Sequence, residues 1–219
     1  EIHCGLVGSE MCIRDRIDDM LHNPVNDQLS RIWQYMYEGV NRANYMIENK
    51  DLIDFPRKDE MYGEVHFLRA FFYFELVKIY GDVPLFTNGR LTAGDSGTLT
   101  RVPKSEVYAV IESDLNSAIS ALPAQKSTDG RATSFTAHAL LGKVYLYQQK
   151  YAEAANILEP LVGLYTLPSD PGSVFLVDGE NGPEAVFEIQ HSKESNGWNW
   201  GWMPQSTEGN FGVIHHGIR

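Results

Sequence analysis

The sequence predicts a mainly α-helical protein built from antiparallel helix pairs. Three observations support this prediction. Residues 64–80 form an apolar run of helical length, apolar residues recur at spacings of three and four in 29–49 and 104–122, and a pattern of small residues typical of closely packed helices lies in 134–162. After about residue 163 the periodicity is lost, and irregular or short β segments are predicted, with extended candidates at 165–167, 173–177 and 185–190.

The first two predicted helices span residues 29–49 and about 58–80. The second is apolar nearly all round, which favours an interior position with other helices on several faces. Gly81 and Pro84 end it. The linker at 50–57 is short, so the two helices are expected to pack antiparallel. The apolar stripe of the first helix consists of Ile32, Met36, Val40, Ala43 and Ile47.

A long loop without regular structure is predicted for residues 81–103. Two interpretations remain open, a functional loop and a simple crossover between helix pairs. An amphipathic helix follows at 104–122, with Ser105 as its candidate cap, Glu106 in its first turn and Pro123 at its end.

Residues 134–162 are predicted to form a tetratricopeptide-like helix pair. Thr133 or Ser134 is the expected cap of its first helix. The small residues Gly142 and Ala154 would let two antiparallel helices approach closely, and Tyr145 and Leu158 would fill the groove between them. One such pair cannot bury its own face, so the other helices must supply the rest of the core.

Composition narrows the classes of function. The chain has 219 residues, a net charge of −11 and a pI of about 5.0, which argues against a nucleic-acid-binding surface. Apolar runs fall short of the ~20 residues of a membrane-spanning helix. Cys4 and Cys12 are interpreted as incidental thiols, because they are too few for a disulfide framework and lack nearby metal ligands.

Sequence signatures of catalysis are absent. The chain has no Gly-x-Ser-x-Gly, no His-Glu-x-x-His, no phosphate-binding loop and no dinucleotide fingerprint. We therefore predict a protein that is not an enzyme, with no catalytic residue, no metal and no cofactor. A glycosidase remains the catalytic alternative, because the fold alone positions its two carboxylates.

The stretch 196–202 is the predicted ligand-binding site. Trp198, Trp200 and Trp202 would share one face of an extended segment, and Asn199 lies between them. Indole faces stack on the C–H faces of sugar rings, and amides can both donate and accept hydrogen bonds to hydroxyls. The alternative is that these tryptophans pack into a core.

Three residues of the first helix carry a similar ambiguity. Asn41 and Asn44 would either tie down a neighbouring loop or bind a sugar hydroxyl. Trp33 lies on the helix stripe and is interpreted as a core residue.

The beginning of the chain differs from the rest. It has neither the basic nor the apolar region of a signal peptide. Residues 1–16 resemble translated adapter sequence, and they are expected to be non-native or a disordered leader. A lipid anchor at the N-terminus is expected to be absent from this chain.

Residues 67–85 (FLRAFFYFELVKIYGDVPL) resemble the signature of the SusD/RagB family, and the pattern at 130–162 and residues 184–190 agree. The resemblance implies that 17–219 is the N-terminal part of a single SusD-like domain, with helices at about 29–162, an irregular loop region at 163–219 and the C-terminal part missing.

The resemblance also implies a function. Family members are lipoproteins on the surface of the outer membrane, which bind glycans or other nutrients without catalysis and deliver them to a SusC-like TonB-dependent transporter. The implied partners are therefore an oligo- or polysaccharide and that transporter, with no nucleic acid. The alternative is a tetratricopeptide-type scaffold for protein–protein interaction without sugar binding.

Overall fold

The computed structural model describes residues 27–89, 91–92, 94–97, 99–125, 128–176 and 179–190. The chain divides into two compact units, of which the first comprises 1–125 and 132–162 and the second 126–131 and 163–219. The expected leader at 1–16 lies outside the described residues, and the prediction of one domain over 17–219 stays a prediction.

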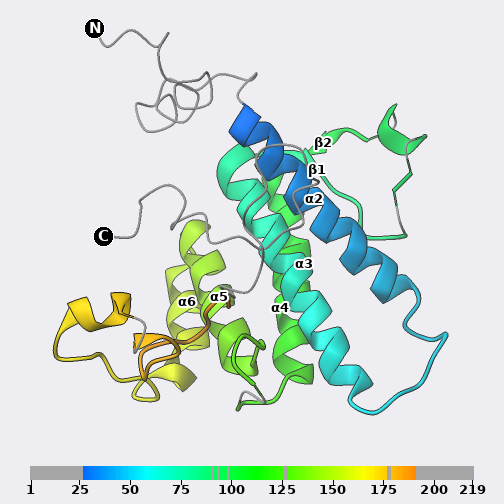
Figure 1. Ribbon diagram of the computed structural model, residues 1–219. Coiled ribbons are helices and arrows are strands. Elements are labelled where there is room, and N and C mark those ends of the chain that lie inside the picture. The colour runs from blue at the N-terminus through cyan, green and yellow to red at the C-terminus, as the bar shows by residue number, and fades with distance from the viewer. Residues whose placement is uncertain are drawn as a thin grey trace, which may run out of the picture. The chain divides into compact units, whose positions relative to one another are not determined.

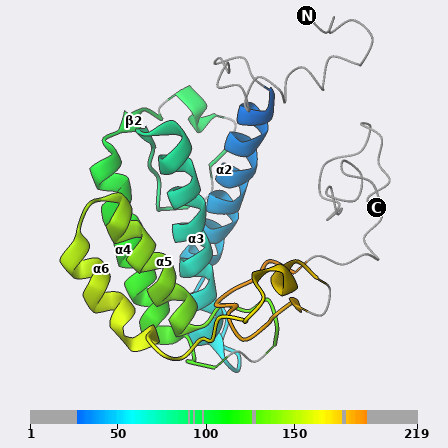
Figure 2. The ribbon, with the colours of Figure 1, turned by 90° about the vertical axis from the view of Figure 1, so that its left-hand side faces the viewer.

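The first unit is a row of helices in which each packs on its neighbours in the sequence (Figures 1 and 2). The helices are α2 (Asp27–Glu48), α3 (Lys58–Tyr80), α4 (Lys104–Ala121), α5 (Ser134–Tyr147) and α6 (Tyr151–Leu158), and the 3₁₀ turn η2 (Glu159–Leu161) follows α6. In Figure 1, α2 and α3 run in opposite directions. The predictions of a mainly α-helical fold and of antiparallel helix pairs are confirmed.

Helix α3 is the centre of this unit. It packs on α2 and α4 and touches α5, and Tyr73, Phe74 and Leu76 are fully buried. The prediction of an interior helix with other helices on several faces is confirmed, although part of the helix surface stays open, with Leu68 and Ile79 each 43% exposed. Burial therefore follows the faces that meet α2 and α4 rather than the apolar character of the whole helix.

The loop after α3 is more ordered than predicted. Its ends pair as a two-residue antiparallel ladder between β1 (Val83–Pro84) and β2 (Arg101–Val102), with Val83 opposite Val102. A 3₁₀ turn, η1 (Asp95–Gly97), lies between them. Gly81, with φ +69°, ends α3 and turns the chain into β1.

Helix α4 begins without a side-chain cap of its own. The prediction that Ser105 caps it is wrong, because the helix already begins at Lys104 and Ser105 lies inside it. The Asp82 carboxylate supplies the missing acceptor, at 2.8 Å from the Lys104 backbone N–H. The same short segment thus ends one helix, starts a strand and caps the next helix.

Helices α5 and α6 confirm the tetratricopeptide-like packing. A capping box between Thr133 and Thr136 starts α5, as predicted for Thr133. A Cβ atom at Gly142 would lie 2.5 Å from Leu158, so the close approach of the two helices requires glycine. Ala154 is 2% exposed in the same contact.

The described part of the second unit is irregular. Its one regular element is the 3₁₀ turn η3 (Pro171–Phe175), so the extended segment expected at 173–177 is wrong for residues 173–175. No strand occurs within 163–176 or 179–190, because most backbone hydrogen bonds there close short turns and leave no partner strand. Among the helices described in both units, none is long and apolar enough to cross a membrane.

Candidate functional site

The segment from β1 to β2 is held against the helices by side chains of α2 and α3. We call residues 84–92 the anchored limb, of which residue 90 is not described. The Tyr37 hydroxyl donates to the Pro84 carbonyl at 2.7 Å. The side-chain oxygen Oδ1 of Asn41 accepts a hydrogen bond from the Leu91 backbone N–H at 2.7 Å. Side chains therefore bind both ends of this limb.

The middle of the anchored limb is held by three further side chains. The Phe86 carbonyl accepts from Asn44 Nδ2 at 3.0 Å and from the Tyr73 hydroxyl at 2.6 Å. The same hydroxyl accepts from the Phe86 N–H at 3.1 Å. Arg69 donates to the next carbonyl, that of Thr87, at 3.2 Å. The backbone polar groups of this limb thus find partners that a sheet or helix would otherwise supply.

A buried ion pair between α3 and α4 fixes the position of these donors. Arg69 contacts Asp114 through two parallel hydrogen bonds of 2.7 Å, and both side chains are at least 92% buried. A third donor of Arg69 reaches Asn44 Oδ1 at 2.8 Å. His66 Nδ1 lies 2.8 Å from Asp114 Oδ1. The Arg69 guanidinium therefore joins α2, α3, α4 and the anchored limb in one network.

The two tyrosine hydroxyls in this network stay protonated. Burial is the largest cause that raises the pKa of Tyr37 and of Tyr73 far above the ordinary value for a phenol. Both hydroxyls consequently remain donors to the carbonyls of the anchored limb.

Aromatic rings flank the network at the start of the limb. The rings of Tyr37 and Phe86 stack with centroids 5.8 Å apart, and Trp33 packs against Tyr37 and Tyr80. The Arg101 guanidinium lies 5.8 Å from the centre of the Trp33 ring. Trp33 is half-buried among these groups, so it is a packing residue at the edge of the core and not the core residue that was predicted.

The structure decides between the two interpretations of Asn41 and Asn44. Both tie down the neighbouring loop, as one interpretation held. The sugar interpretation is wrong for Asn44, because its side chain is fully buried and both amide atoms are bonded. The predicted ligand residues Trp198, Asn199, Trp200 and Trp202 lie outside the described residues, so their role stays a prediction.

The pair of Arg69 and Asp114 was not predicted from the sequence. A signal was present, because Arg69 interrupts a helix that is apolar nearly all round, and a charge on such a helix must be paired. Asp114 likewise precedes the core residue Leu115. The sequence pattern does not identify which acid would pair with Arg69, since the answer depends on the packing of α4 against α3.

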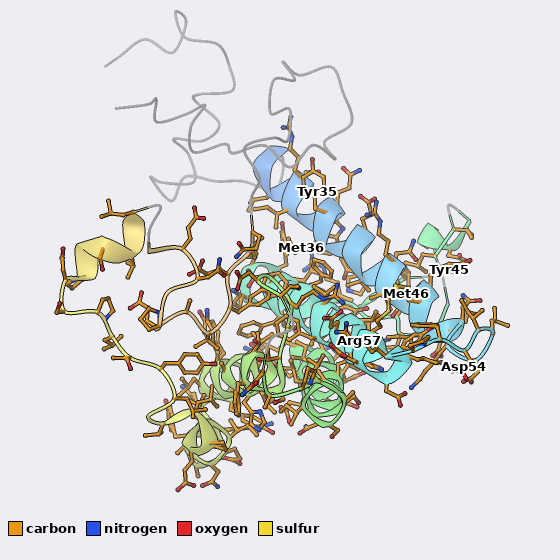
Figure 3. The ribbon with its side chains drawn as sticks, turned by 60° about the horizontal axis from the view of Figure 1, so that its bottom comes forward. Tyr35, Met36, Tyr45, Met46, Asp54 and Arg57 are labelled. Carbon is orange, nitrogen blue, oxygen red and sulfur yellow. The ribbon has the colours of Figure 1, made fainter. Side chains whose placement is uncertain are left out.

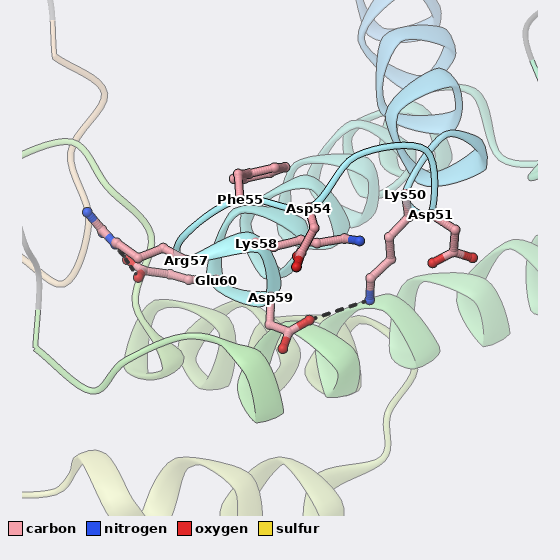
Figure 4. A pocket seen from close by; sticks show the side chains of 8 residues that line it. All are labelled: Lys50, Asp51, Asp54, Phe55, Arg57, Lys58, Asp59 and Glu60. Atoms are coloured by element: carbon pink, nitrogen blue, oxygen red, sulfur yellow. Dashed lines mark hydrogen bonds and ion pairs between the residues drawn. The ribbon is translucent and has the colours of Figure 1, made fainter.

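A second feature is an open hollow at the connection between α2 and α3 (Figure 4). Four of its charged side chains are already paired: Lys50 lies 3.8 Å from Asp59, and Arg57 donates to Glu60 at 2.7 Å. Figure 3 shows Asp54 and Arg57 in this connection and Tyr45 and Met46 on the adjoining end of α2. The paired charges and open shape make it a weaker candidate than the anchored limb.

The anchored limb exposes uncharged polar groups on a support that hydrogen bonds hold to α2 and α3. Asn88 and Thr92 are exposed. Such groups can hydrogen-bond a neutral, hydroxyl-rich ligand. Within the described part of the chain, no three His, Cys, Asp or Glu residues are placed to share a metal ion.

Replacing Tyr73 by Phe should loosen the anchored limb. The change leaves the Phe86 N–H without its acceptor and removes one donor to the Phe86 carbonyl, so the free energy of unfolding should fall by about 1–2 kcal/mol. Hydrogen exchange at the Phe86 amide should accelerate. Tyr151→Phe, at a side chain that is 64% exposed, is the control and should change neither quantity. Unchanged exchange at Phe86 in Tyr73→Phe would contradict this account.

Comparison with known proteins identifies the family. The family model described as "Starch-binding associating with outer membrane" matches residues 10–146, more than half of the chain. The chain therefore belongs to the SusD-like family. SusD-like protein P38 of Formosa agariphila is 30% identical over 195 residues, which cover 82% of this chain and 38% of that protein.

Solved structures agree with the fold. A laminarin-binding SusD-like protein has a TM-score of 0.70 at 34% identity, over 78% of this chain and 40% of the other. A SusD superfamily protein from Bacteroides vulgatus has a TM-score of 0.73 at 27% identity, over 84% of this chain and 40% of that protein. Surface glycan-binding protein A from Bacteroides thetaiotaomicron was solved in complex with laminarihexaose. It has a TM-score of 0.65 at 25% identity, over 74% of this chain and 35% of that protein. The chain spans about two fifths of the length of two curated relatives that it matches, SusD-like proteins P38 and P2 of Formosa agariphila.

Proposed function

We propose that this chain is part of a non-catalytic protein that binds glycans at the surface of the outer membrane. The observation that carries the proposal is the match to the SusD-like family together with a 34% identical structure that binds laminarin. A second relative was solved with laminarihexaose. The anchored limb fits this function, because it offers neutral polar groups on a support that is already ordered.

Delivery to a SusC-like TonB-dependent transporter is the second part of the proposal. It rests on the family resemblance and on the family's association with the outer membrane. Co-purification of such a transporter with the full-length protein from solubilised outer membranes would support delivery. A full-length protein that purifies alone under conditions that preserve other outer-membrane complexes would contradict it.

We further propose that Trp198, Asn199, Trp200 and Trp202 contact the glycan. Three indoles at alternate positions give a flat apolar surface for sugar rings, and the Asn199 amide can bind a hydroxyl group. Hydrophobic stacking and neutral hydrogen bonds suit an uncharged polysaccharide better than a charged one.

Removing the three indoles should weaken binding. In affinity gels containing laminarin or another polysaccharide from a purified panel, the triple variant Trp198→Ala, Trp200→Ala, Trp202→Ala should bind at least about tenfold more weakly, a loss of about 1.4 kcal/mol. Tyr151→Ala removes an exposed aromatic ring elsewhere and should migrate like the parent chain. Unfolding curves of the variants show whether each remains folded.

The outcomes separate the site from the function. If the triple variant is retarded as strongly as the parent chain, the tryptophan stretch is not the site, although the protein still binds glycan. If a full-length protein containing this chain is retarded by no polysaccharide of the panel, the glycan function is contradicted and a scaffold for protein–protein interaction is favoured.

A further inference from the structure

The chain contains three Asn–Gly steps, and two of them differ in the hydrogen bonds that hold the asparagine side chain and the glycine N–H. They are Asn88–Gly89, Asn181–Gly182 and Asn196–Gly197. The first lies in the anchored limb of the first unit, and the second lies in a turn of the second unit. The third lies outside the described residues.

An Asn–Gly step can modify itself without an enzyme. The backbone nitrogen of the glycine attacks Cγ of the asparagine, a new C–N bond closes a five-membered succinimide, and the side-chain nitrogen leaves as ammonia with the proton of the glycine N–H. Water then opens the ring to aspartate or isoaspartate, so the net change is one water consumed and one ammonia released. The reaction requires a side chain that is free to turn toward the backbone and a glycine N–H that is not held.

Asn88 meets both requirements. Its side chain is exposed, and within the described residues it has no hydrogen-bond partner. Among the same residues, the Gly89 N–H donates no hydrogen bond. Gly89 has φ +68° and carries no Cβ atom to obstruct the ring closure.

Asn181 meets neither requirement. Its amide is paired with that of Gln190 in both directions, with Nδ2 donating to Oε1 at 3.1 Å and Oδ1 accepting from Nε2 at 3.0 Å. The Asn181 backbone N–H donates a hydrogen bond to the Glu188 carboxylate at 2.9 Å. The attacking nitrogen, Gly182 N, donates to the Gly179 carbonyl at 3.2 Å. Ring closure at Asn181 therefore requires the amide pair with Gln190 and the hydrogen bond of the Gly182 N–H to break first.

We propose that Asn88 is a site of spontaneous deamidation and that the hydrogen bonds of Asn181 protect the second Asn–Gly step from the same reaction. The product adds a negative charge at residue 88, and the following residue already lies near a carboxylate, because a Cβ atom at Gly89 would be 3.5 Å from both carboxylate oxygens of Glu48. Isoaspartate also adds a backbone atom to the limb. This inference does not depend on the proposed glycan function.

Peptide mapping by mass spectrometry tests the proposal. The full 219-residue chain is incubated at neutral pH, and the deamidated fraction at each step is followed with time, with enzymatic methylation of isoaspartate as a second readout. Asn88 should deamidate at least about tenfold faster than Asn181, a difference of about 1.4 kcal/mol in activation free energy. Equal rates, or a faster reaction at Asn181, would overturn the proposal.

Two controls separate the effect of the fold from that of the local sequence. In denaturant the rates at Asn88 and Asn181 should converge, and a difference that persists there would show that the fold is not its cause. Gln190→Met keeps the Cβ and Cγ atoms that lie against Gly130 but removes the amide. It should accelerate the reaction at Asn181 and leave that at Asn88 unchanged, and an unchanged rate at Asn181 would contradict protection by the amide pair.

Discussion

Replacing Arg69 by Met should lower the free energy of unfolding by about 3–5 kcal/mol, the loss expected when one partner of a buried ion pair is removed. The variant leaves the Asp114 carboxylate buried at 4% side-chain exposure without its two guanidinium hydrogen bonds. Asn44 Oδ1 and the Thr87 carbonyl lose donors as well. Urea unfolding followed by circular dichroism measures the loss.

Two variants test the cause of this effect. Arg42→Met removes a cation from an exposed pair with Glu38 and should change the free energy of unfolding by about 0.5 kcal/mol or less. Arg69→Met combined with Asp114→Leu removes both buried charges and should recover most of the loss. A loss below about 1 kcal/mol in Arg69→Met alone would show that the pair is not the link between α3 and α4.

Truncating Leu76 to Ala should lower the free energy of unfolding by about 2–5 kcal/mol, because the side chain is fully buried and its removal leaves a cavity. Leu68 offers a matched control on the same helix, since it is the same residue type but 43% exposed. Leu68→Ala should lower the free energy of unfolding by less than about 1 kcal/mol. Both losses can be measured in the same urea titration.

The comparison between the two leucines tests which faces of α3 are covered. Similar losses at Leu68 and Leu76 would mean that α3 is buried all round, as its composition predicts. A large difference would confirm that the face of α3 that carries Leu68 is open while the faces toward α2 and α4 are buried.

The sequence predicted the helices closely, because apolar periodicity and end signals act locally. The second predicted helix has the bounds observed for α3, and Thr133 caps α5 as expected. The pairing of β1 with β2 was not predictable from two residues on each side, since such a short ladder has no period to detect. Ser105 was a plausible cap by type, but Asp82 reaches Lys104 from a distant part of the chain.

The candidate site was less predictable than the fold. The residues of the network come from three helices, and only their packing brings Asn44, Arg69 and Asp114 together. A hold on a neighbouring loop was one of the two interpretations of Asn41 and Asn44 that the sequence left open, because polar side chains on an apolar helix need partners. The tryptophan stretch remains a prediction from residue type and spacing alone.

The short β1–β2 ladder has a consequence for how this scaffold can diversify. It closes the base of the connection between α3 and α4, and Asp82 fixes the start of α4 beside it. The connection between the anchored limb and β2 can then change in sequence or length while the hydrogen bonds that hold the limb to α2 and α3 are kept. Lengthening such a loop destabilises the fold only slightly, because each doubling of loop length adds about 0.6 kcal/mol to the entropic cost of loop closure. Relatives that share this fold at 25–34% identity can therefore keep one frame while they vary the insert that it carries.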